Sequence, residues 1–72
     1  MNFYDDYLTQ QSITRYKIAK ETGISPSTLQ RAADAKEIDN ISMRIIIATA
    51  KALDKTPGTV ADELINVYNQ YK

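Results

Sequence analysis

The 72-residue sequence predicts an all-α fold, a compact bundle of five helices in a single domain spanning residues 1–72. Two observations predict it. Four serine or threonine residues each stand directly before a segment with apolar side chains at helical spacing, which is how a helix typically begins. No stretch alternates polar and apolar residues over a useful length, and the β-prone Ile45–Ile47 has flanks that fit a helix better than a strand.

The first two helices are expected at about Asn2 to Gln10 and at about Arg15 to Glu21. Thr14 precedes the second of them and has a side chain suited to capping its N-terminus. A turn over residues 21–24 then contains Gly23, the residue type that most readily takes the left-handed conformation that ends a helix.

The third helix is expected from Pro26 to Ala33, or as far as Ala35. Ser25 is its N-cap, and Pro26 occupies the first helical position, where its missing N–H costs nothing. Apolar residues of the second and third helices and of the turn between them are expected to share one core: Ile18, Ala19, Ile24, Leu29 and Ala32.

The remaining two helices follow a loop that ends at Ile41. Ser42 caps the fourth helix, from Met43 to Leu53, and Thr56 caps the fifth, from Pro57 to about Tyr71. Proline at the first helical position of this last helix repeats the arrangement at the start of the third.

Composition argues against several classes of function. The chain has no histidine and no cysteine, so it lacks the usual neutral-pH general base, the commonest metal ligands and any disulfide. The adjacent carboxylates at residues 5–6 and 62–63 do not converge on one point of a helix. We therefore expect no enzyme, cofactor, metal site or small-molecule substrate. No apolar run approaches the roughly 20 residues that span a membrane, and the acidic start is unlike a signal peptide, so a cytoplasmic protein is expected.

Net charge is zero, but the charges are unevenly distributed. The segment from Thr14 to Lys36 holds five basic and two acidic side chains and is the one basic stretch of the chain. A neutral protein has weak non-specific affinity for nucleic acid, so a DNA-binding role would depend on contacts to bases and on dimerisation.

The run IAKETGISPSTLQR resembles the helix-turn-helix of the phage-repressor family, the class of the lambda repressor and Cro. The matching residues are Ile18, Ala19, Gly23, Ile24, Ser25, Thr28 and Leu29. The likeness extends from about Leu8 to Ile65, because Ala50–Leu53 and Thr56 to Leu64 resemble the end of that domain. The chain departs from the family at residues 34–37, where members often have Gly-Lys or Gly-Arg, and at Asp54, where they often have glycine.

The resemblance implies a lambda-repressor-like DNA-binding domain of a prokaryotic or phage transcriptional regulator, expected to be a repressor, whose third helix reads the major groove of double-stranded DNA. The residues expected to contact DNA are Arg15, Tyr16, Lys17, Lys20, Ser25, Ser27, Thr28, Gln30, Arg31 and Lys36. The Gln30 side chain can form hydrogen bonds to adenine, and the Arg31 side chain can form them to guanine or to a phosphate. Tyr16 can either donate to a phosphate or pack against the first helix. Pro26 occupies a position where family members often have a base-reading side chain, and it cannot donate a hydrogen bond.

The fifth helix has an apolar stripe wider than one packed face requires. Part of it is expected either to form the surface of a homodimer, with Ile65, Tyr68 and Tyr71, or to fold back on the aromatic residues of the first helix.

A rival interpretation is a protein-interaction module that has kept the helix-turn-helix but lost DNA binding. Zero net charge and Pro26 favour it, whereas Arg31 and the basic segment from Arg15 to Lys20 oppose it. Acidic cover from Glu37 or Asp39 over the outer side of the third helix would strengthen it.

Overall fold

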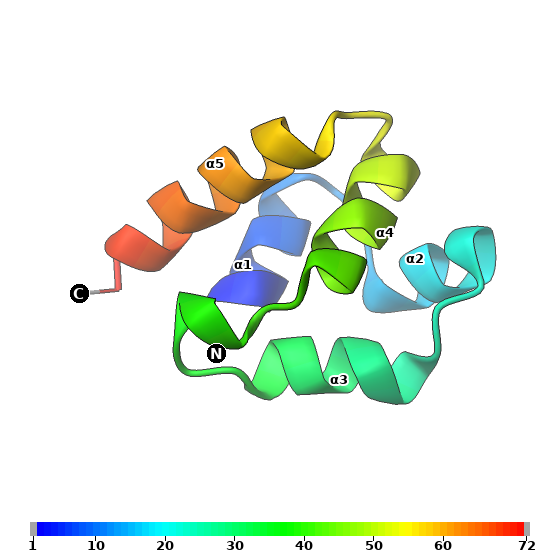
Figure 1. Cartoon of the computed structure of the whole chain (residues 1–72), viewed down its shortest axis with the longest axis horizontal. Helices are drawn as coiled ribbons and strands as arrows, with labels where there is room; N and C mark the ends of the chain where they lie inside the picture. Colours follow the sequence, from blue (N-terminus) through cyan, green and yellow to red (C-terminus); the bar gives the residue numbers. More distant parts are fainter. Residues whose placement is uncertain (1, 72) are drawn as a thin grey trace.

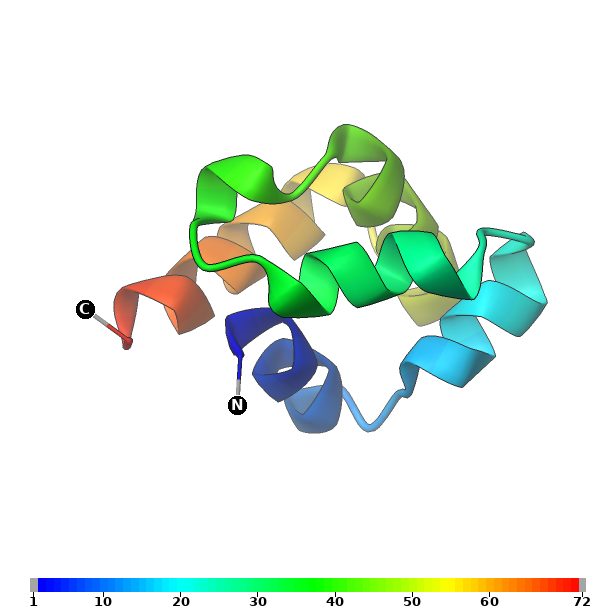
Figure 2. The ribbon, with the colours of Figure 1, turned by 90° about the horizontal axis from the view of Figure 1, so that it is seen from below.

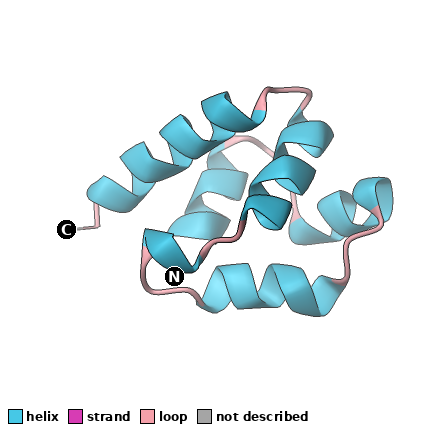
Figure 3. Ribbon diagram, viewed as in Figure 1, coloured by secondary structure: helices cyan, strands magenta, loops and turns pink. Residues whose placement is uncertain are grey.

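Five α-helices and one short 3₁₀ helix make up the computed structural model, which describes residues 2–71. Their bounds are α1 Phe3–Gln10, α2 Arg15–Thr22, α3 Pro26–Asp34, η1 Ile38–Asn40, α4 Met43–Leu53 and α5 Pro57–Asn69. No strand occurs among these residues (Figure 3), so the predicted all-α class is confirmed. None of the described helices has the length and apolar character needed to cross a membrane.

Side-chain caps begin all five α-helices. In each case the capping side chain accepts a hydrogen bond from the backbone N–H three residues later, and the caps are Asn2, Thr14, Ser25, Ser42 and Thr56. The four predicted serine and threonine caps are confirmed. The expected start of the first helix at about Asn2 is one residue early, because the side-chain amide oxygen of Asn2 caps the helix from outside.

Two left-handed residues end α2 and α4. Gly23 ends α2 with a φ of 75°, and its N–H donates to the carbonyl of Ala19 at 2.9 Å. Asp54 ends α4 with a φ of 57°, so this aspartate adopts the conformation that a glycine would take most easily. Because α2 continues to Thr22, the turn before α3 is residues 23–25, one residue shorter than predicted.

The helices pack around one core, with α3 along one edge and α5 along the opposite edge (Figure 1). α1 packs on α5, and α4 packs on both α5 and α2. The largest fully buried side chains come from every α-helix: Tyr4, Tyr7, Leu8, Ile18, Leu29, Thr49, Val60 and Leu64. Of the predicted core, Ile18, Leu29 and Ala32 are buried, and Ala19 and Ile24 are half-buried against them.

One buried hydrogen-bond chain ties α1 to α4. The Thr49 hydroxyl donates to the carbonyl of Ile45 at 2.8 Å, so its oxygen is left to accept the proton of the Tyr4 hydroxyl, also at 2.8 Å. Both side chains are completely buried, and burial raises the pKa of Tyr4. The buried hydroxyls of Tyr4 and Thr49 therefore both have hydrogen-bond partners, as buried polar groups require.

A second polar cluster fastens the start of α5 to α1. The Lys55 ammonium lies 2.9 Å from Glu63 Oε1 and donates to the side-chain oxygen of Gln11. The Tyr7 hydroxyl donates to the same Glu63 oxygen at 2.8 Å. The hydrogen bond from Lys55 is the main reason that the pKa of Glu63 is lowered. These groups hold the two helices together.

The apolar stripe of α5 is mostly buried in the domain itself. Tyr68 packs its ring edge-on against Phe3, with ring centroids 4.9 Å apart, and its hydroxyl donates to the carboxylate of Glu37. Tyr68 is only 8% exposed, so its assignment to a dimer surface is wrong, and the alternative, packing against the first helix, is confirmed for this residue. Ile65 and Tyr71 remain exposed, at 42% and 47%.

Candidate nucleic-acid interface

The outer side of α3 is a polar helix surface supported from behind by the core. Leu29, Ala32 and Ala33 are buried, while the opposite side of the helix is exposed at Pro26, Ser27, Gln30, Arg31 and Asp34. Viewed from below, α3 crosses the middle of the domain, with α1 and α2 on one side and η1 and α4 on the other (Figure 2). No other described element crosses in front of α3 in this view.

The start of α3 is ordered by its own hydroxyls. Ser25 Oγ accepts the N–H of Thr28 at 3.2 Å and lies 2.8 Å from the Thr28 hydroxyl and 3.2 Å from that of Ser27. Ser25 and Ser27 are exposed and Thr28 is half-buried. All three predicted contact residues thus lie together at the N-terminal end of the helix.

Arg15 and Gln30 were predicted as separate contacts, and the structure brings them together. The Arg15 guanidinium donates to Gln30 Oε1 at 2.6 Å and lies 3.2 Å from an oxygen of Asp5. The Gln30 amide nitrogen donates to Asp34 at 3.0 Å. An amide oxygen has two lone pairs and an amide nitrogen two protons, so Gln30 retains one acceptor site and one donor.

The other predicted cations are exposed, and most have no ion-pair partner within residues 2–71. Lys17 lies 3.7 Å from Glu21, one turn away on α2, a surface ion pair of the kind that contributes at most about 1 kcal/mol. Within residues 2–71, no ion pair involves Lys20, Arg31 or Lys36. Tyr16 is 74% exposed, so the alternative in which it packs against the first helix is wrong.

The acidic residues after α3 do not pair with its outer side. The Glu37 carboxylate is bound by the hydroxyl of Tyr68 on α5. Asp39 is exposed on η1. In the described part of the chain, no hydrogen bond or ion pair joins either residue to Ser27, Thr28 or Arg31, although Asp34 places one carboxylate at the far end of α3 itself.

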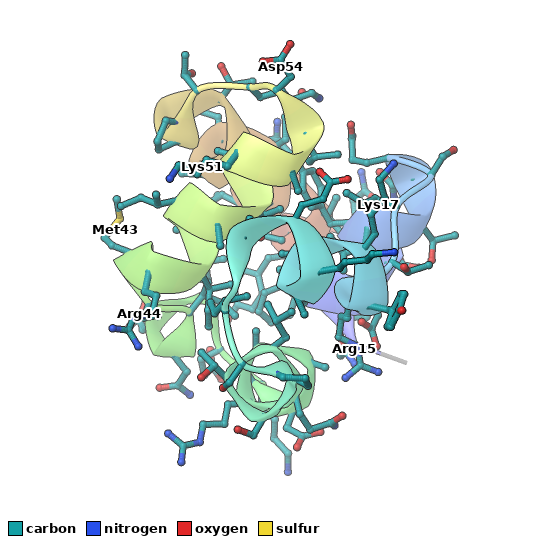
Figure 4. The ribbon with its side chains drawn as sticks, turned by 90° about the vertical axis from the view of Figure 1, so that its right-hand side faces the viewer. Arg15, Lys17, Met43, Arg44, Lys51 and Asp54 are labelled. Carbon is teal, nitrogen blue, oxygen red and sulfur yellow. The ribbon has the colours of Figure 1, made fainter. Side chains whose placement is uncertain are left out.

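Two cations on α4, Arg44 and Lys51 (Figure 4), were not predicted as site residues. Both line a groove beside the turn between α2 and α3. The net charge of residues 37–54 gives no sign of these two cations, because three acidic residues in the same segment outnumber them. One signal could have indicated this surface: three consecutive isoleucines, Ile45–Ile47, cannot all face the core from one helix.

Comparisons of the chain with models of known families, with curated protein sequences and with solved structures find no match. The interpretation of this surface therefore depends on its residues and their geometry.

Proposed function

We propose that the chain is a helix-turn-helix protein of the phage-repressor type, which binds specific sequences of double-stranded DNA in the cytoplasm and acts as a transcriptional repressor. The observation that carries the proposal is the polar outer side of α3, which is exposed along its length and held in place by Leu29 and Ala32 behind it. A helix of this kind fits the major groove, which is about 12 Å wide.

Base readout is proposed for the outer side of α3. The unpaired Arg31 guanidinium can donate two hydrogen bonds to guanine, or it can bind a close phosphate. The remaining donor and acceptor of Gln30 are the pair of groups that adenine recognition requires. Since Arg15 and Asp34 already hold the Gln30 amide, its orientation is set before DNA arrives.

Phosphate contacts are proposed for the cations and hydroxyls around that helix. Lys17, Lys20 and Tyr16 are exposed on α2, and Lys36 is exposed just beyond α3. For Arg15 we propose a role other than the predicted DNA contact, because its guanidinium forms an ion pair with Asp5. We assign Arg15 to positioning Gln30.

A homodimer is part of the proposal, because one small neutral domain offers few contacts for tight operator binding. Ile65 and Tyr71 are the exposed apolar residues proposed for such a contact, although the Tyr71 hydroxyl already donates to Asp6 of α1 at 2.9 Å. A dimer requires two half-sites in the bound DNA whereas a monomer reads one, so the symmetry of the bound sequence tests this part.

The Arg31→Ala variant tests the assignment of α3. We expect it to lose about 1–3 kcal/mol of binding free energy, and to lose preference at one position per half-site if Arg31 reads a base. The measurement is affinity for the preferred site and for sites changed one base pair at a time. Lys51→Ala is the matched control, since Lys51 is another exposed, unpaired cation, placed on α4. Wild-type affinity of Arg31→Ala for every sequence would contradict the assignment.

A further inference from the structure

One side of α4 is left uncovered by the rest of the domain. Met43 is 59% exposed and Ile47 is 44% exposed, although both belong to the most apolar helix of the chain. Beside Ile47 runs a groove of about 660 Å³, bounded on its other side by residues 22–25 and Thr28. The exposed side chain of Ile47 therefore lines a hollow that another molecule can enter.

Apolar side chains, hydroxyl side chains and two cations line the groove. Ile24, Ile47 and Ala48 supply the apolar surface. Arg44 and Lys51 lie on the same side of α4, seven residues and therefore about 10.5 Å apart along its axis. Neither has an ion pair within residues 2–71, and no acidic residue lines the groove. In Figure 4 the two side chains stand along α4, with Arg44 toward α3 and Lys51 toward Asp54.

These features favour a protein partner over nucleic acid. Phosphates would complement the cations, but they would leave the exposed Ile47 side chain without apolar contact. Lys51 also lies at the end of α4 near Asp54, whereas the proposed DNA contacts are centred on α3; Ser25 and Thr28 of that surface border the same groove. A second copy of this chain does not fit either. Arg44 and Lys51 are seven positions apart, so two carboxylates of a partner helix would need the same spacing to pair with both, and no two acidic residues of the chain have it.

We propose that this groove binds an acidic amphipathic helix of another protein. Two carboxylates one heptad apart on that helix pair with Arg44 and Lys51, and an apolar side chain between them packs on Ile47 and Ala48. The spacing matches because two helices that run side by side have the same rise per residue. The inference goes beyond DNA binding and does not depend on it.

A synthetic helical peptide provides the test. The probe carries two glutamates one heptad apart with leucines between them, and a control peptide has lysines in place of the glutamates. Fluorescence anisotropy of the labelled probe should show saturable binding to the wild-type protein. Amide shifts in NMR spectra should change at residues 22–28 and 43–51. The lysine peptide should not bind.

Two variants make the test specific. Lys51→Glu should weaken binding of the probe at least about tenfold, which is 1.4 kcal/mol, and Ile47→Ser should weaken it as well. Both side chains are exposed, so the thermal unfolding of each variant should stay close to that of wild type. Lys20→Glu, the matched control outside the groove, should bind the probe like wild type.

Several results would overturn the proposal: no binding of the acidic probe, equal binding by Lys51→Glu, or shift changes confined to other helices. Because the measurements contain no DNA, failure here leaves the proposed DNA binding unaffected. If the acidic probe does not bind and Lys51→Ala weakens DNA binding as much as Arg31→Ala does, the groove belongs to the nucleic-acid interface and the protein partner is excluded.

Discussion

Replacing Leu29 with alanine is expected to destabilise the domain by about 2–5 kcal/mol. Leu29 is 1% exposed and belongs to the core that joins α3 to the other helices. Removing most of its side chain loses apolar burial and leaves a cavity that the surrounding helices fill only in part. Because a small domain has about 5–15 kcal/mol of stability in total, this single change removes a large share of it.

Urea unfolding of the wild type and the variant measures the effect. Ile47→Ala is the matched control, because it also shortens a branched apolar side chain but at an exposed position. It should change the free energy of unfolding by no more than about 0.5–1 kcal/mol. Unchanged stability of Leu29→Ala, or equal losses in the two variants, would show that α3 does not pack as described.

Raising the salt concentration from about 50 to 200 mM is expected to weaken DNA binding by roughly 10³-fold. Three exposed cations per subunit, Lys17, Lys20 and Lys36, are proposed to contact phosphates, so a dimer neutralises about six. Arg15 is left out of this estimate because it already pairs with Asp5. Affinity titrations at several salt concentrations give the slope.

Lys17→Ala should lower the magnitude of that slope by about 0.9 for each subunit and weaken binding to all sequences alike. The ion pair with Glu21 is weak and exposed, so its loss should have little effect on folding. Binding that does not depend on salt would contradict the proposed phosphate contacts.

Local features of the fold could be predicted from the sequence because they depend on neighbouring residues. A serine or threonine followed by proline marks the start of a helix whatever its tertiary contacts, as at Ser25–Pro26 and Thr56–Pro57. Gly23 marks the end of α2 in the same local way. The predicted bounds of the five α-helices therefore lie within about two residues of those in the structure. The short η1 helix was not predicted, since three residues carry too little periodicity to be recognised.

Contacts between distant residues could not be predicted in the same way. Tyr68 has the same apolar spacing whether it faces a partner subunit or Phe3, and only the packing of α5 against α1 decides between them. Likewise, nothing local to Arg15 indicates that Asp5 and Gln30 share its guanidinium. Sequence patterns could thus propose where the candidate site lies along the chain, but not the partners of its side chains.

Selection of genomic DNA fragments by the purified full chain at low salt tests the central claim most directly, because the operator sequence does not have to be chosen beforehand. We predict strong enrichment of a few fragments that share an inverted repeat, with half-site centres about one helical turn, ~34 Å, apart. Arg31→Ala should enrich the same fragments less strongly. Recovery of no fragment above the background of random DNA would contradict the claim that this domain reads DNA sequence.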